Sequence, residues 1–146
     1  VVLTADCLPV LLARTDGSAV AAVHAGWRGL QAGIIAQGVS RIAPKGEPVS
    51  AWLGPAICGK CYQVGDEVYR AFVDTQADFK DAFHADATPH HWRFSVAQAA
   101  MIELARLGVE DVQGGELCTA CDLKRFYSYR KEGDTGRFAS LIWLDQ

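Results

Sequence analysis

The sequence predicts a single domain of mixed α/β or α+β class, and three observations support this prediction. The 146 residues fit one domain of ordinary size. Half of the residues are hydrophobic and 21% are charged, so a packed core is expected rather than disorder. Short apolar runs typical of strands alternate with stretches in which apolar residues recur every three to four positions, as in helices, without a repeat or a linker.

Strands are expected where the apolar runs are short. The run at 1–13 is rich in Val and Leu and predicts a strand buried on both faces. The turn residues at 15–18 would join it to a second strand at 19–23, which makes an antiparallel hairpin. Further strands are expected at 49–53, 109–112, 126–129 and 139–144.

Three ranges predict helices, because their apolar residues fall on one helical face: 29–42, 65–77 and 96–107. Pro44-Lys45-Gly46 would end the first helix and Gly108 the last. The stretch at 76–91 is polar and contains Asp, Thr and Pro, so a helix end and a loop are expected there.

Composition argues against nucleic-acid and membrane partners. The formal net charge is -3 and the basic residues are scattered, unlike a nucleic-acid footprint. No apolar run approaches the roughly 18 residues of a membrane helix. The five cysteines are an odd number and one lies in an apolar run, which predicts a reducing, cytoplasmic setting rather than a disulfide scaffold.

Four of the cysteines form two CxxC pairs, Cys58/Cys61 and Cys118/Cys121. Such pairs suggest a zinc ribbon, but in structural zinc modules they usually lie about 15 to 20 residues apart. Here about 60 residues separate them, and that segment is itself a sizeable globular stretch. The zinc-ribbon interpretation is therefore disfavoured, and the loop at 52–65 is interpreted as the wall of a pocket.

Cys7 and His24 form a second candidate constellation. Cys7 lies in an apolar run beside Asp6, and by itself it is more typical of a core residue. The predicted hairpin would carry Cys7 and His24 to about the same height, and they would meet if their side chains share a face. Such a pair suits a Cys–His nucleophile, or two ligands of zinc or copper. A catalytic zinc usually has three protein ligands. The chain offers no obvious third, and Cys61 is one possibility.

The C-terminal part brings aromatic and guanidinium groups close together in the sequence. Aromatic faces suit a purine or a phenol, and arginine suits phosphate. A terminal hairpin with ordinary cross-strand aromatic pairs is the alternative, and the residue types alone favour it. The residues concerned are Tyr127, Tyr129, Arg130 and Arg137.

Four sequence motifs together resemble the laccase-domain family over essentially the whole chain. They are TADCLPVLL, AAVHAGWRGLQAGI, WLGPAICGKCYQVG and CTACDLKRFYSYRKEGDTGRFASLIWL, in the order and spacing of that family. The pairing of ADCLP with HAGWRG, which places Cys7 and His24 17 residues apart, is a specific signature. Members were first described as multicopper polyphenol oxidase-like proteins and are regarded as purine nucleoside phosphorylases that also deaminate adenosine.

The resemblance implies a site and its boundaries. Cys7 and His24 match two metal ligands of the family, whereas the family's first histidine ligand belongs to an upstream motif that is absent here. Residues 1–146 are thus expected to be a single laccase-like domain that lacks its N-terminal part. Two departures from the family pattern concern the pocket: Phe94-Ser95 replaces Phe-Asp, and Arg130-Lys131 replaces Arg-Arg.

The resemblance also implies a fold and an activity. The fold is α+β, with mixed β-sheets flanked by helices in an α/β/β/α-type sandwich similar to the catalytic domain of cytotoxic necrotising factors. The activity is that of a zinc-dependent purine nucleoside phosphorylase with adenosine deaminase activity. Phosphate and adenosine, inosine, guanosine or methylthioadenosine would be its substrates. The expected catalytic residues are Cys7, His24 and Asp6, and the expected substrate-binding residues are Arg28, Tyr127 and Arg130.

Three alternatives stay open. A copper-dependent polyphenol oxidase would need several copper ions and many histidines, whereas the chain has four. An inactive fragment would expose apolar surface until an N-terminal segment or a second chain completes the domain. A metal-free Cys–His amidohydrolase would be insensitive to chelators. Asp6 as a proton carrier follows only from its position next to Cys7.

Overall fold

The computed structural model describes residues 1–145, and a four-stranded sheet forms its centre. The strand order is β3-β2-β4-β8. The strand β2 is antiparallel to β3 and to β4, whereas β4 and β8 are parallel. This mixed sheet confirms the expected α+β class. The bounds are β2 Leu8–Arg14, β3 Val20–Ala25, β4 Val49–Leu53 and β8 Asp111–Gly114.

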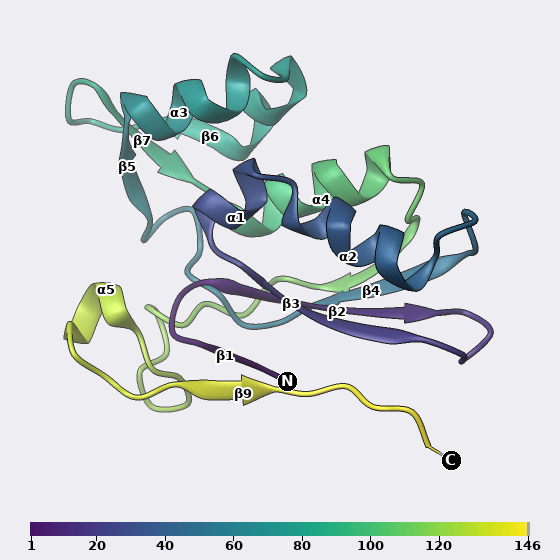
Figure 1. Ribbon diagram of the computed structural model, residues 1–146. Helices are drawn as coiled ribbons and strands as arrows, with labels where there is room; N and C mark the ends of the chain where they lie inside the picture. Colours follow the sequence, from purple (N-terminus) through teal and green to yellow (C-terminus); the bar gives the residue numbers. More distant parts are fainter. Residues whose placement is uncertain (146) are drawn as a thin grey trace.

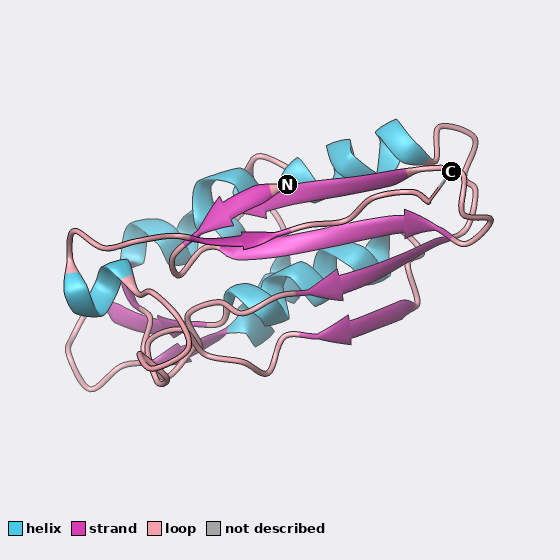
Figure 2. Cartoon of the chain, turned by 90° about the horizontal axis from the view of Figure 1, so that it is seen from below, coloured by secondary structure: helices cyan, strands magenta, loops and turns pink. Residues whose placement is uncertain are grey.

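Helices cover one face of this sheet, and a two-stranded ribbon lies below the other (Figure 1). Seen from below, the strands lie in front of the helices (Figure 2). The ribbon pairs β1 (Val2–Thr4) with β9 (Phe138–Ser140), the two ends of the chain. The covering helices are α1 Trp27–Gln31, α2 Ile34–Ile42 and α4 Val96–Arg106.

A third, three-stranded sheet packs beside the helices with antiparallel order β5-β7-β6. Its aromatic side chains form a compact cluster in which Phe83 and Phe94 stack at 4.4 Å between ring centroids. The remaining elements are β5 Gln63–Gly65, α3 Asp66–Val73, the 3-10 helix η1 Ala77–Ala82, β6 Phe83–Ala85, β7 His91–Phe94 and α5 Tyr129–Glu132.

The core lies between the central sheet and its helices. Leu8, Val10 and Leu12 alternate along β2 and are fully buried on the helix side. Gly38 of α2 lets the helix approach the sheet closely, since a Cβ there would lie 2.9 Å from Val23 Cγ2. The other face of the sheet is less covered, and Trp52 keeps 40% of its surface exposed.

Several elements differ from the prediction. The expected strand at 1–13 divides into β1 and β2, because Asp6 adopts a φ of 86° that no strand accommodates. The expected helix at 29–42 divides at Gly33, whose φ is 75°. The expected loop at 76–91 contains η1 and β6.

The C-terminal hairpin was predicted wrongly. No strand forms at 126–129, and Tyr129 instead begins the short helix α5. The strand β9 pairs with β1, a partner from the opposite end of the chain that no local pattern indicates. No helix within residues 1–145 is long and apolar enough to cross a membrane.

Candidate active site

A pocket of about 420 Å³ lies where the β2–β3 hairpin ends. Its volume is typical of sites for small molecules. The residues that line it come from separate segments of the chain: Ala5, Asp6, Cys7, His24, Gly26, Trp27, Ile57, Tyr62, Val96, Tyr129, Arg130 and Arg137.

The hairpin places Cys7 and His24 in this pocket. In the β2–β3 ladder, Leu8 pairs with Ala25 and Pro9 with His24, so Cys7 lies one residue beyond the ladder. Its Sγ lies 3.0 Å from the position of a Cβ on Gly26. Cys7 is half-buried and His24 is exposed. The two residue types that suit a metal or a nucleophile therefore share one cavity.

The surroundings of Cys7 disfavour a free thiolate. Burial raises the pKa of the Cys7 thiol, the Asp6 carboxylate acts in the same direction, and Arg137 opposes both. A reactive cysteine nucleophile usually has a lowered pKa, and the pKa of the Cys7 thiol is shifted in the opposite direction. A bound cation would favour the thiolate.

Asp6 holds the pocket wall together. Its Oδ1 accepts a hydrogen bond from Thr119 Oγ1 at 2.6 Å, and its Oδ2 accepts one from the Arg130 backbone N–H at 2.7 Å. Its backbone carbonyl accepts the N–H of Ile57 at 2.9 Å. These contacts give Asp6 a positioning role, and the proton transfer expected from its adjacency to Cys7 stays a prediction.

Two arginines give the pocket positive charge. Arg130 lies over the ring of Tyr62, with 4.9 Å between its Cζ and the ring centroid, and it donates to the Gln63 carbonyl at 3.1 Å. Arg137 donates to the carbonyls of Thr135 and Gly136 at 2.6 and 2.9 Å. Within residues 1–145, neither guanidinium forms an ion pair with a carboxylate. Both charges are therefore available to an anion.

Two of the expected substrate-binding residues lie outside the pocket lining. Arg28 is exposed and stacks on the Trp27 ring, with 4.4 Å between its Cζ and the ring centroid. Tyr127 is 47% exposed and its ring packs against Gly136. Their binding roles stay predictions, whereas Arg130 does line the pocket.

Among the lining residues that the expected site did not include, four carry an aromatic ring or a guanidinium group. Tyr129 and Arg137 belong to the C-terminal aromatic and arginine cluster, so a signal for them was present in the sequence. Trp27 lies within the HAGWRG motif. Tyr62 lies in the loop at 52–65, which the sequence analysis interprets as the wall of a pocket. The added residues are Trp27, Tyr62, Tyr129 and Arg137.

The pocket offers two metal donors, Cys7 and His24, whereas a catalytic zinc usually has three protein ligands. Within residues 1–145, no third His, Cys, Asp or Glu forms a ligand group with them. Cys61, which the sequence left as a possible third donor, lies instead with three other cysteines in a different cluster. The pocket's two donors, a thiol and an imidazole, fit zinc by type.

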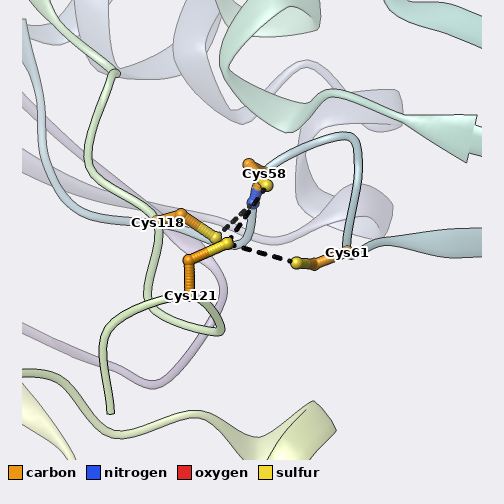
Figure 3. Close-up of side chains that lie close together, drawn as sticks. All are labelled: Cys58, Cys61, Cys118 and Cys121. Atoms are coloured by element: carbon orange, nitrogen blue, oxygen red, sulfur yellow. Dashed lines mark hydrogen bonds between the residues drawn. The ribbon is translucent and has the colours of Figure 1, made fainter. Parts of the chain in front are cut away.

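The two CxxC pairs converge, contrary to the expectation from their spacing. The sulfur atoms of Cys58, Cys61, Cys118 and Cys121 all lie within 4.8 Å of one another (Figure 3). These four residues are called the cysteine cluster below. The sequence separation was misleading because tertiary pairing, and not chain proximity, brings the two loops together.

Gly26 offers a test of the pocket geometry. Its φ of -72° and ψ of 164° suit any residue, so Gly26→Ala strains no backbone. The added methyl would lie against Cys7 Sγ and cover it. We expect the free energy of unfolding to fall by about 1 kcal/mol, because the 3.0 Å contact forces Sγ to shift, while alkylation of Cys7, followed by peptide mass spectrometry, slows severalfold. The exposed Cys121 serves as an internal control, and faster alkylation of Cys7 would contradict the geometry.

The chain is similar to known proteins over its described length. The sequence model of a family described as "Multi-copper polyphenol oxidoreductase laccase" matches residues 1–145. Purine nucleoside phosphorylase PA4543 of Pseudomonas aeruginosa is 46% identical over 143 residues, which cover 98% of this chain and 59% of that protein. Purine nucleoside phosphorylase YfiH of Escherichia coli (strain K12) is 46% identical over 145 residues, covering 98% and 58%.

Solved structures show the same similarity. The crystal structure of Neisseria meningitidis protein NMB0706 matches with a TM-score of 0.94 and 42% identity, over 99% of this chain and 60% of that one. Bacillus licheniformis protein YfiH matches with a TM-score of 0.84 and 31% identity, over 92% and 53%. The chain therefore spans less than two thirds of the length of these relatives.

Proposed function

The chain belongs to the multi-copper polyphenol oxidoreductase laccase family, and from this premise we propose that its pocket serves a zinc-dependent purine nucleoside phosphorylase with adenosine deaminase activity. Relatives at 46% identity are named purine nucleoside phosphorylases. The observation that carries the proposal is the pocket that joins Cys7 and His24 to three aromatic rings and to two arginines that form no ion pair within residues 1–145.

The lining chemistry suits a purine nucleoside and phosphate. The rings of Trp27, Tyr62 and Tyr129 offer faces on which a purine base can stack. Arg130 and Arg137 offer guanidinium groups that match a phosphate. In phosphorolysis a phosphate oxygen bonds to ribose C1′, the C1′–N9 bond breaks, and the base leaves with its bonding electrons and is protonated. The main task of the protein is to hold the phosphate oxygen close to ribose C1′ in the geometry that the reaction needs.

The metal of this site is zinc in our proposal, with copper as the alternative. Cys7 and His24 would hold the ion, with water or a donor from outside residues 1–145 as the third ligand. Thiolate and imidazole suit both metals. The bound ion supplies Lewis-acid chemistry for hydrolytic deamination of adenosine. A multicopper oxidase of phenols is less well supported, because His24 is the one histidine among the pocket-lining residues.

The proposal extends to the setting of the protein. Its partners would be small molecules, and its thiol ligands suit the reducing cytoplasm. A further segment of the natural protein, or a second chain, would cover the apolar surface that the described residues leave exposed, such as Trp52 and Leu141.

The direct test is product analysis with and without phosphate. We expect inosine to give hypoxanthine and ribose 1-phosphate only when phosphate is present, and adenosine to give inosine without it. If neither reaction occurs, the chain alone is an inactive scaffold. If phenol oxidation occurs with copper and no nucleoside reacts, the oxidase alternative is correct.

Arg137→Gln separates the two reactions. Loss of a charged hydrogen bond to phosphate costs about 1.5–3 kcal/mol, so phosphorolysis should slow by about 10- to 100-fold through a higher KM for phosphate. Adenosine deamination consumes water and not phosphate, so it should change far less. Arg106→Gln, on the exposed side of α4, is the matched control. Equal loss of both reactions would argue against a phosphate role for Arg137.

A further inference from the structure

The cysteine cluster is a second site, separate from the pocket. Its sulfur atoms lie close together, with 3.5 Å between Cys61 and Cys121 and 4.0 Å between Cys58 and Cys121. The backbone N–H of Cys58 also donates to Cys118 Sγ at 3.2 Å. None of these four residues lines the pocket that holds Cys7 and His24. All five cysteines of the chain are free thiols.

The sulfur separations match a tetrahedral metal centre. Zinc binds thiolate sulfur at about 2.3 Å, and four such ligands in a tetrahedron lie about 3.8 Å apart. The separations of 3.5 and 4.0 Å bracket that value. A disulfide would need about 2.05 Å. The geometry therefore fits four thiolates around one ion better than it fits crosslinked pairs.

The central sheet explains how distant loops build this site. The strands β4 and β8 are parallel neighbours, so the loops that follow them leave the sheet at the same edge. Ala56 and Cys118 then form a parallel bridge, in which Ala56 N–H donates to the Leu117 carbonyl at 3.1 Å. The first CxxC begins two residues beyond this bridge, and the second begins at the bridge itself, with Cys118. The fold thus delivers two ligands from each loop to one point.

We propose that the cysteine cluster binds one zinc ion as a structural tetrathiolate site and thereby fixes the pocket wall. Four-cysteine sites of this kind have no open position and stabilise folds. Binding would release the four thiol protons. Lys60, Arg93 and Arg125 line the hollow beside the cluster and offset the negative charge of the bound thiolates, although Glu116 and Asp122 lie there too.

The neighbours of the ligands connect the cluster to the pocket. Ile57, next to Cys58, lines the pocket and donates its N–H to the Asp6 carbonyl at 2.9 Å. Tyr62, next to Cys61, makes a cation–π contact with the Arg130 guanidinium, which lies over its ring. Thr119, next to Cys118, donates to the Asp6 carboxylate at 2.6 Å. An ion that binds both loops would therefore stabilise the three pocket contacts that these neighbouring residues make.

X-ray absorption of the bound zinc is the decisive measurement. It is made on the chain carrying Cys7→Ser, which removes the pocket's thiolate and leaves the cluster intact. We expect one zinc per chain, surrounded by four sulfur atoms at about 2.3 Å. A zinc shell with fewer than three sulfur atoms, or no zinc bound by the reduced chain, would overturn the proposal.

Two variants of one ligand give an independent result. Cys61→Ser should lose the cluster zinc and lower the Tm, whereas Cys61→His should keep the zinc with three sulfur atoms and one nitrogen, because Cys₃His sites also bind zinc. An unchanged zinc content in Cys61→Ser would overturn the proposal. If that variant does not fold, the absorption measurement decides alone. Failure of the nucleoside activity leaves these readouts unchanged, since none of them measures turnover.

Discussion

Asp6→Ala is expected to lower the free energy of unfolding by about 3–5 kcal/mol. Without the carboxylate, the buried hydroxyl of Thr119 and the part-buried backbone N–H of Arg130 lose their acceptor. An unsatisfied buried group costs about 1–3 kcal/mol, and the part-buried N–H costs less because water can reach it. Asp6 also adopts a φ of 86°, which an aspartate tolerates better than an alanine, at about 1–2 kcal/mol. Chemical denaturation of both proteins measures the difference.

Asp6→Asn is the matched control. The asparagine Oδ1 can accept the Arg130 N–H while its Nδ2 donates to Thr119 Oγ1, so both contacts survive without the charge. Asparagine also tolerates the left-handed region. We expect a loss of no more than about 1 kcal/mol. If the asparagine variant is as unstable as the alanine variant, then the charge of Asp6, and not its hydrogen-bond geometry, stabilises the wall.

The same residue shows where sequence reasoning ends. The hairpin of β2 and β3 was predictable because its turn residues and alternating apolar positions are local. The break at Asp6 was not, because the groups that stabilise its positive φ lie 113 and 124 positions away. A backbone conformation that depends on distant partners leaves no periodic signal in the chain.

The cysteines show a second limit of the same kind. Their spacing of about 60 residues argued against a common site, yet the parallel pairing of β4 and β8 brings the loops together. Parallel partners are separated by a long crossover connection, so sequence distance says little about how close their ends lie. For the pocket, by contrast, the local hairpin pattern was enough to predict that Cys7 and His24 lie close together, and both line one cavity.

The final prediction is that Cys7→Ser abolishes zinc binding in the pocket. Loss of a partner that only orients a metal ligand costs about 10- to 100-fold in affinity or activity, so loss of a ligand should cost at least about 100-fold. Serine has nearly the same size and Cys7 is only half-buried, so the free energy of unfolding should change by less than about 1 kcal/mol. Phosphorolysis and deamination should then both fall in a protein that remains folded.

Cys118→Ser makes this prediction specific, because it removes one ligand of the cysteine cluster and leaves Cys7 and His24 in place. Zinc analysis of the two variants should show each losing a different ion, with the cluster zinc kept in Cys7→Ser and the pocket zinc kept in Cys118→Ser. A zinc content that Cys7→Ser leaves unchanged would contradict the pocket as a metal site within this chain. It would mean that the third donor, from outside residues 1–145, must be present before Cys7 and His24 can hold an ion, because two protein ligands fall short of the usual three.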